Sequence, residues 1–457
     1  MVFGFSKKDK SGHTKGQVPD GLDAFWMPFT PQRDYKKNRL RSLVSAKGMY
    51  YKTEDGRSML DGCSGFGCTN FGHNHPKITE AIQRQAAQLD FAPNFQFSSS
   101  VAFEAADVLC KAMPEHINHV FFSNSGSEAV DTALKIALAY WRAKGKSEKT
   151  RFVGRLRSYH GVNFGGISVG GISYMRKNFS SSLIPGCDHL PHTHNLEKQA
   201  FSKGQPEWGA HLADELENLI YLHSAENIAA VIVEPVAGST GTLVPPVGYL
   251  ERLREICTKH DILLIFDEVI TAWARLGYAT AAEKFNVMPD IITSAKGITN
   301  ATVPLGATFV SDEIYDAFMQ GPENQIEFLH GYTYSGHPLA CAAALATQDV
   351  IKEDGMYEQA QKIAPIWEDA LHTLKGTRHV TDVRACGLMG GVQIDLGDRP
   401  ADKKSRGAEV FNKMFFEQDI TMRYTVDVLG LYPSVIVNED EIGIIVDRLK
   451  KTLETVE

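Results

Sequence analysis

Short apolar runs bounded by polar residues predict the strands of a buried sheet. The clearest runs cover residues 229–233 and 262–266, which are rich in aliphatic side chains and too short for a helix. Such runs suit strands covered on both faces of a parallel sheet. Further strands are expected at 119–122, 150–156, 291–292 and 306–310.

Apolar residues spaced three and four apart predict helices between these strands. The expected helices cover residues 76–89, 101–113, 129–141, 249–260 and 339–351. Regular alternation of strand and helix indicates an α/β domain with a mainly parallel sheet. We therefore expect the carboxyl ends of these strands to meet along one edge, where ligands bind in such folds.

The pattern changes after residue 350. Helical segments, among them 356–374 with Pro365 as a kink or boundary, alternate with short strands such as 391–394, and a last helix starts near 438. This mixture predicts a smaller α+β domain. The expected division is a flexible tail (1–20), an N-terminal segment packing with the small domain (21–75), a large domain (76–336) and a small C-terminal domain (337–457).

Charge and cysteine usage exclude several classes of function. The net charge is −8 and no long basic run occurs, which argues against nucleic acid as a partner. No apolar stretch approaches the roughly 20 residues that cross a bilayer. The seven cysteines are scattered, and the polar N-terminus lacks the apolar core of a signal peptide, so reduced thiols and a cytoplasmic location are expected. His189, His192 and His194 cluster around a proline, which favours a loop over a metal site.

A strand, a Ser/Gly turn and a helix follow one another at residues 119–141. The turn contains Ser125, Gly126 and Ser127. Free backbone N–H groups and the dipole at a helix N-terminus favour an anion, and serine hydroxyls can donate to it. An ordinary helix cap needs only one serine. The turn is therefore a candidate phosphate site, although it does not match a nucleotide-binding loop.

Asp267 and Lys296 each end a predicted strand, 29 positions apart. A helix-capping aspartate and a solvated lysine are the ordinary alternatives for such residues. Tyr159, His160 and Glu234 also follow predicted strands, so all these groups are expected at one edge of the sheet. A lysine, an aspartate, an aromatic ring and a phosphate site together fit pyridoxal 5′-phosphate, which is held covalently by lysine and paired at its ring nitrogen with aspartate.

The chain resembles the class III pyridoxal-phosphate aminotransferases, most closely their ω-amino acid:pyruvate (β-alanine:pyruvate) branch. The resemblance covers about residues 21–457. The segments that carry it are 26–30 (WMPFT), 118–122 (NHVFF), 125–128 (SGSE), 159–163 (YHGVN), 188–193 (DHLPHT), 233–235 (VEP), 266–271 (FDEVIT), 295–296 (AK) and 330–335 (HGYTYS). It implies the type I aminotransferase fold, with a seven-stranded sheet and a smaller α+β domain.

The resemblance also implies residue roles. Lys296 would hold the cofactor covalently and move the proton, while Asp267 would pair with the ring nitrogen. Val269 and Tyr159 would pack on the two ring faces. The remaining cofactor-site candidates are Ser125, Gly126, Ser127, His160, Glu234 and Thr333, and the substrate-site candidates are Trp26, Phe66, Tyr159 and Arg423. Thr333 would reach the phosphate of a neighbouring subunit, which implies a homodimer with shared active sites or a tetramer.

The implied reaction is ping-pong transfer of an amino group from an ω-amino acid or amine to pyruvate, whose carboxylate Arg423 would bind. Two positions depart from the family pattern. Gly67 stands where a tryptophan is common, and Ala272-Trp273-Ala274-Arg275 replaces Gly-Phe-Gly-Arg. These changes leave the donor open between β-alanine, a longer ω-amino acid, a diamine, taurine and an aryl amine. An aminomutase, or a binding protein without activity, remains an alternative on the same fold.

Overall fold

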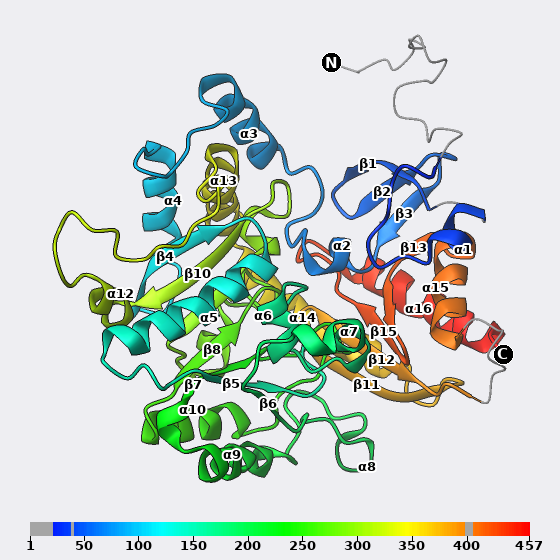
Figure 1. Ribbon diagram of the computed structural model, residues 1–457. Coiled ribbons are helices and arrows are strands. Elements are labelled where there is room, and N and C mark those ends of the chain that lie inside the picture. The colour runs from blue at the N-terminus through cyan, green and yellow to red at the C-terminus, as the bar shows by residue number, and fades with distance from the viewer. Residues whose placement is uncertain (1–21, 38–40, 398–404) are drawn as a thin grey trace.

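A seven-stranded sheet forms the centre of the computed structural model, which describes residues 22–37, 41–397 and 405–457 (Figure 1). The strand order is β4-β10-β9-β8-β7-β5-β6, and only β10 runs against its neighbours. The strands are β4 (Ile117–Ser123), β5 (Arg151–Arg155), β6 (Cys187–Leu190), β7 (Ile228–Val233), β8 (Leu263–Asp267), β9 (Ile291–Ser294) and β10 (Gly306–Ser311). The predicted α/β class with a mainly parallel seven-stranded sheet is confirmed.

Both faces of this sheet are covered, as the continuous apolar runs predict. Along β7, Val231 packs into the core on one face and Ile232 into the core on the other. The helix α5 (Gly126–Ala143) covers the second face, and α10 (Tyr249–Lys259) contributes to the first. The other helices around this sheet are α3 (Pro76–Gln88), α4 (Ser100–Cys110), α6 (Phe164–Val169), α7 (Ser173–Arg176), α8 (Leu196–Gln199), α9 (Glu215–His223), α11 (Ala281–Phe285), α12 (Asp312–Phe318) and α13 (Pro338–Glu353), with short 3₁₀ turns η1 (Lys177–Ser182), η2 (Ala210–Asp214), η3 (Ala225–Asn227) and η4 (Lys296–Thr299).

The C-terminal part forms a second, antiparallel sheet of four strands in the order β11-β12-β15-β14. A third sheet joins the N-terminal hairpin to this part, because β3 pairs in parallel with β13. The elements are α1 (Gln32–Lys37), β1 (Leu43–Lys47), β2 (Tyr50–Thr53), β3 (Ser58–Asp61), α2 (Ser64–Gly67), α14 (Met356–His372), β11 (Val380–Cys386), β12 (Met389–Ile394), α15 (Arg406–Glu417), β13 (Ile420–Thr421), β14 (Arg423–Thr425), β15 (Val428–Leu431) and α16 (Glu439–Thr455).

The predicted domain division stays a prediction, and its flexible tail (1–20) lies outside the described residues. Residues 43–61 do pair with a strand of the C-terminal part. In contrast, α13 lies beside α3 and α4, where Cys341 packs against Ala102 and Ala105 (Figure 1). The helix that opens the expected small domain therefore contacts helices of the expected large one.

Two local predictions differ from the structure. Pro365 is not a helix boundary, because α14 continues through it, while a kink there stays a prediction. Buried Ile363 and Trp367 on either side anchor that segment in the core. His192 and His194 lie in the expected loop, but His189 belongs to β6, whose residues 187–190 pair in parallel with β5 at the sheet edge. Their mixed polar and apolar pattern carries no strand signal, and pairing with β5 decides their conformation.

Candidate active site

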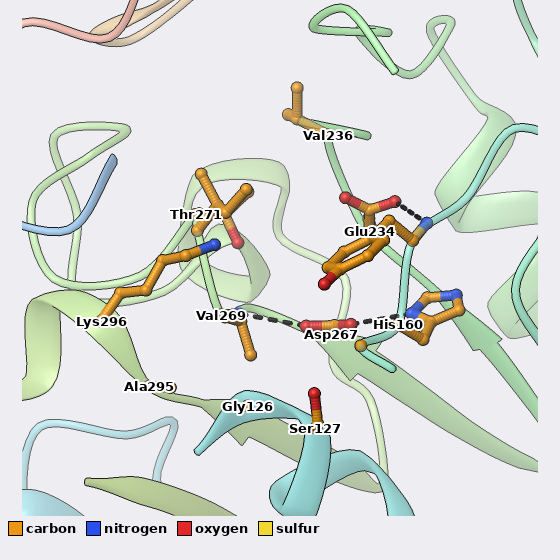
Figure 2. Close-up of a pocket in the computed structure, with 13 residues that line it drawn as sticks. Gly126, Ser127, His160, Glu234, Val236, Asp267, Val269, Thr271, Ala295 and Lys296 are labelled. Atoms are coloured by element: carbon orange, nitrogen blue, oxygen red, sulfur yellow. Dashed lines mark hydrogen bonds and ion pairs between the residues drawn. The ribbon is translucent and has the colours of Figure 1, made fainter. Parts of the chain in front are cut away.

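A pocket lies at the carboxyl ends of the parallel strands (Figure 2). Its lining combines eight of the predicted site residues with five that sequence reasoning did not single out. The eight are Gly126, Ser127, Tyr159, His160, Glu234, Asp267, Val269 and Lys296; the five are Gly161, Val236, Ile270, Thr271 and Ala295. Each of the five lies within two residues of a predicted one, so position after a strand was the signal that could have found them.

The first wall of the pocket is the N-terminus of α5. Ser125 caps the helix, since its hydroxyl accepts from the backbone N–H of Glu128 at 3.2 Å, and it does not line the pocket. The Ser127 hydroxyl accepts from Val162 N at 3.1 Å. Gly161 has φ +92°, and a Cβ there would lie 2.4 Å from Ser127 Oγ, so only glycine permits this close approach. The result is a narrow, N–H-rich corner suited to an anion.

Asp267 ends β8 and is almost fully buried. Its Oδ2 lies 2.7 Å from His160 Nδ1, and its Oδ1 accepts from Val269 N at 3.2 Å. The other ring nitrogen, His160 Nε2, is buried and has no hydrogen-bond partner among the described residues. A carboxylate oriented by a histidine in this way can hold a proton on a ring nitrogen placed beside it.

Lys296 follows β9 and has φ +48°, a conformation that non-glycine residues rarely adopt. Its side chain extends toward the same space as Asp267 and Glu234 (Figure 2). Burial lowers the pKa of the Lys296 amine, and the positive charge of Arg423 contributes in the same direction. A lysine with a lowered pKa is a better nucleophile and proton acceptor near neutral pH.

Glu234 connects two loops at the pocket. Its Oε1 accepts from Tyr159 N at 2.8 Å, and its Oε2 accepts from Gly238 N at 3.0 Å. Burial raises the pKa of this carboxyl group. Both oxygens are used by backbone donors, so Glu234 fixes the loop that carries Tyr159 relative to the turn at Gly238.

Besides Ser125, four predicted residues lie outside the pocket lining. Arg423, on β14, donates from Nη2 to Ser239 O at 3.3 Å and to Thr425 Oγ1 at 3.2 Å, and its Cζ lies 5.9 Å from the centre of the Phe66 ring. In the described part of the chain, no carboxylate forms an ion pair with Arg423. Trp26, Phe66 and Thr333 are exposed, Trp26 to 88%.

The two departures from the family pattern have different surroundings. A Cβ on Gly67 would lie 3.6 Å from Ile270, which lines the pocket. Arg275 is fully buried and donates to Ser64 Oγ at 2.7 Å and Asn70 Oδ1 at 2.6 Å. It therefore joins the large sheet to the N-terminal segment.

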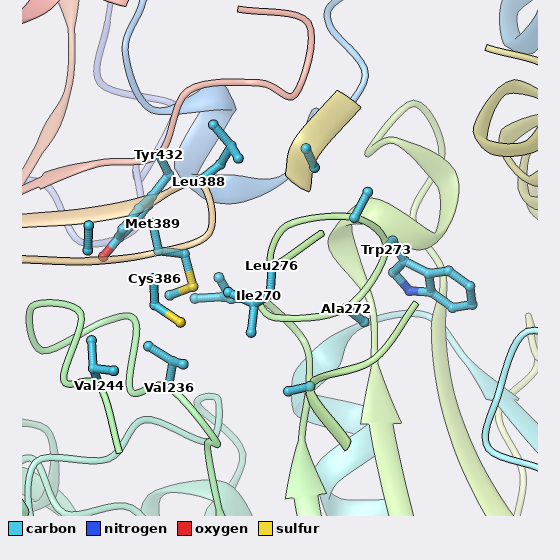
Figure 3. Close-up of a cluster of buried hydrophobic side chains, with 14 of the residues drawn as sticks. Val236, Val244, Ile270, Ala272, Trp273, Leu276, Cys386, Leu388, Met389 and Tyr432 are labelled. Atoms are coloured by element: carbon cyan, nitrogen blue, oxygen red, sulfur yellow. The ribbon is translucent and has the colours of Figure 1, made fainter. Parts of the chain in front are cut away.

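The altered segment is built around a buried tryptophan. Trp273 donates from Nε1 to Ser294 Oγ at 2.7 Å, and it belongs to the same buried cluster as Ile270, Leu276 and Met389 (Figure 3). Trp273 and Ala274 have φ +59° and +66°, values that glycine adopts at less cost. The altered segment thus packs behind β9 and does not enter the pocket.

These residues fit pyridoxal 5′-phosphate. The corner at α5 suits its phosphate, and the His160–Asp267 pair suits its ring nitrogen. The buried Lys296 amine, whose pKa is lowered, suits the covalent link. In the described part of the chain, no group of three or more His, Cys, Asp or Glu side chains could hold a metal ion, and no helix is long and apolar enough to cross a membrane.

Comparison with known proteins places this fold and site in one class. The family model of the class-III aminotransferases matches residues 32–453, and the chain belongs to this pyridoxal phosphate-dependent family. It is 55% identical to an omega-aminotransferase of Caulobacter vibrioides, covering 95% of this chain and 98% of that protein. It is 46% identical to a beta-alanine–pyruvate aminotransferase of Pseudomonas aeruginosa, covering 94% and 96%.

Solved structures agree. An amine transaminase from an uncultivated Pseudomonas species, determined in its pyridoxal phosphate-bound form, superposes with a TM-score of 0.87 at 33% identity, covering 96% of this chain and 99% of that one. An (S)-enantioselective omega-transaminase from Thermomicrobium roseum gives a TM-score of 0.86 at 32% identity, covering 93% and 95%. The predicted aminotransferase fold and family are confirmed.

Proposed function

We propose that this chain is an ω-aminotransferase that moves an amino group from an ω-amino acid or amine to pyruvate by a ping-pong mechanism. The observation that carries the proposal is the meeting of Lys296 with the buried Asp267–His160 pair in one pocket. The names of the relatives from Caulobacter and Pseudomonas support the ω-amino and pyruvate specificity.

Each residue of the pocket has a separate role in this reaction. Pyridoxal phosphate, when bound, supplies an electron sink for the negative charge that develops on the donor carbon. Lys296 would hold the cofactor, and its Nζ would accept the proton from the donor carbon and return it. Asp267, oriented by His160, keeps the ring nitrogen protonated. Gly126 and Ser127 form the phosphate corner, and Ser125 caps the helix that carries them. Val269 and Tyr159 enclose the ring, and Glu234 fixes the Tyr159 loop.

Arg423 binds the carboxylate of the acceptor. Its guanidinium forms no ion pair with a carboxylate of the described residues. Its positive charge lowers the pKa of the Lys296 amine, so the guanidinium acts on the pocket. A planar fork of donors is what a carboxylate needs. Trp26, Phe66 and Tyr159 complete the substrate side, and Phe66 lies next to the Arg423 guanidinium.

We expect the choice of amine donor to depend on the side of the pocket near Gly67. A Cβ at this position would already contact Ile270 and Tyr432, so a larger residue would change the wall there. An aminomutase, or a transaminase for taurine, a diamine or an aryl amine, is the alternative, since these use the same cofactor residues. One relative, 31% identical, is a putrescine–pyruvate aminotransferase of Pseudomonas aeruginosa, which keeps a diamine donor among the candidates.

The cofactor's near-visible absorption tests this function. Candidate amines are added one at a time to the purified holoenzyme without a keto acid. Loss of the band with an amine, followed by its return with pyruvate, is the expected result and identifies the donor class. A band that every amine leaves unchanged would contradict the transaminase proposal, and a band that amines remove but pyruvate does not restore would contradict pyruvate as acceptor.

We further propose a homodimer with shared active sites, or a tetramer built from such dimers. Exposed aromatic residues of 91–97 lie against the loop 329–337; the rings of Phe91 and Tyr334 are 5.7 Å apart, and Phe97 and Leu329 are also exposed. Apolar patches of this kind mark protein interfaces. Thr333 is exposed in the same loop, where it can reach a neighbouring subunit's phosphate corner.

Light scattering tests the assembly. A mass of at least twice the 50.5 kDa of one chain is expected. Phe97→Asp should lower both the mass and the activity, because a charge would be buried in the interface. Tyr221→Asp, at an exposed position on α9, is the matched control and should change neither. A fully active monomer would contradict shared sites.

A cytoplasmic location is also proposed. All seven cysteines are free, as expected where thiols stay reduced. Fractionation of cells that produce the tagged protein would test it.

A further inference from the structure

The turn at residues 238–241 receives side-chain hydrogen bonds on four successive carbonyl groups. The bonds are Tyr432 Oη to Gly238 O (2.7 Å), Arg423 Nη2 to Ser239 O (3.3 Å), Arg157 Nη2 to Thr240 O (3.1 Å), and Arg384 Nε and Nη2 to Gly241 O (3.0 and 2.8 Å). Three of these donors come from the C-terminal part of the chain. The turn is therefore a connection between the two main sheets.

This turn is also connected to the pocket. Gly238 N donates to Glu234 Oε2 at 3.0 Å, and the other oxygen of Glu234 accepts from Tyr159 N. Residues 234–243 are all buried, so the turn has little room to move. A displacement of its carbonyl groups would be transmitted to Arg423 on one side and to Glu234 on the other.

Arg384, on β11, is the side chain that holds this turn most firmly. Two of its nitrogens converge on Gly241 O, and its Nη1 contacts the Asp382 carboxylate and Gln393 Oε1. Gly241 has φ +113°, and a Cβ there would lie 2.8 Å from Val428, so the turn backbone lies directly against the start of β15. A charged donor shared by one carbonyl in a buried setting makes a strong bond.

Arg384 is also linked, through Gln393, to the hairpin of β14 and β15 that carries Arg423. Gln393 accepts from Arg384 and donates from Nε2 to Asp427 Oδ2 at 2.9 Å. Asp427 lies in the connection between β14, which carries Arg423, and β15. Thr425, two residues after Arg423, donates to Ser239 O at 3.0 Å. Arg384 thus contacts the turn that binds the Arg423 guanidinium and is linked through Gln393 to the hairpin that carries the Arg423 backbone.

We propose that Arg384 is a positioning residue that sets the place of the Arg423 guanidinium, and thereby the affinity for the acceptor carboxylate, without touching substrate itself. The inference rests on the proposed role of Arg423. A purely structural role of Arg384 would affect every acceptor equally. A positioning role affects acceptors that carry a carboxylate far more than those that do not.

The test compares pyruvate with butanal, an acceptor without a carboxylate, in the holoenzyme carrying Arg384→Lys. Lysine keeps the charge but cannot direct two nitrogens at Gly241 O while holding Gln393. We expect the KM for pyruvate to rise about tenfold, and kcat and KM for butanal to change less than twofold. Arg406→Lys is the matched control, because Arg406 is equally buried in the C-terminal part, pairs with Asp395 and donates to Glu457 O, yet does not contact the turn.

Two further variants test whether Arg384 acts through Arg423. In an Arg423→Ala background, Arg384→Lys should add nothing to the pyruvate KM. If Arg384→Lys does not fold, Gln393→Met, which removes the link between Arg384 and Asp427 but leaves the bonds from Arg384 to Gly241 O, should still raise the pyruvate KM selectively. Equal effects on both acceptors, or an unchanged pyruvate KM in a folded variant, would overturn the proposal. An Arg423→Ala enzyme that treats pyruvate as the wild type does would instead remove the role of Arg423 itself.

Discussion

Replacing Lys296 with alanine is expected to lower kcat by about 10³-fold or more, because the variant loses both the covalent attachment of the cofactor and the group that moves the proton. Its amine lines the pocket, and burial lowers its pKa. Steady-state turnover with an amine donor and pyruvate measures the loss. Turnover within tenfold of the wild type would contradict the proposed mechanism.

Two controls separate chemistry from folding in this experiment. Lys259→Ala removes an exposed lysine of α10 that pairs with Glu217, and it should leave turnover unchanged. Borohydride treatment followed by peptide mass spectrometry should find the cofactor attached to Lys296 in the wild type and in Lys259→Ala, but not in Lys296→Ala. Attachment at another lysine would show that the site has been assigned to the wrong residue.

Replacing Arg423 with alanine is expected to raise the KM for pyruvate by about 10²-fold, since a charged, forked hydrogen bond to a carboxylate contributes roughly 1.5–3 kcal/mol. An aldehyde without a carboxylate should change by less than about threefold on the same argument. Steady-state kinetics with both acceptors measures the difference. Arg423→Lys, which keeps the charge but loses the planar fork, should fall between the two enzymes for pyruvate.

Two other outcomes for Arg423→Ala would contradict its role in carboxylate binding. Equal losses with pyruvate and the aldehyde would mean that Arg423 supports the structure through Ser239 and Thr425, its present hydrogen-bond partners. No loss with either acceptor would place the carboxylate site elsewhere in the pocket.

The strand ends were the part of the site that sequence could predict. Asp267 and Lys296 stand after short buried runs, and parallel strands carry such residues to one edge of a sheet. Glu234 and Tyr159 were predicted on the same ground, and the pocket contains all four. Periodicity failed where pairing rather than pattern decides the conformation, as in β6, whose residues carry no apolar alternation.

The sequence by itself determined the α/β class, the order of the central elements and the residue types that reach the pocket, because apolar periodicity and position after a strand are local properties. Only the tertiary structure decided that His160 orients Asp267, that β10 runs against its neighbours, and that Arg384 and Arg423 meet on one turn. The two residues of each such contact lie up to 184 positions apart in the chain. Local pattern cannot encode such contacts, since they arise only when separate segments pack together.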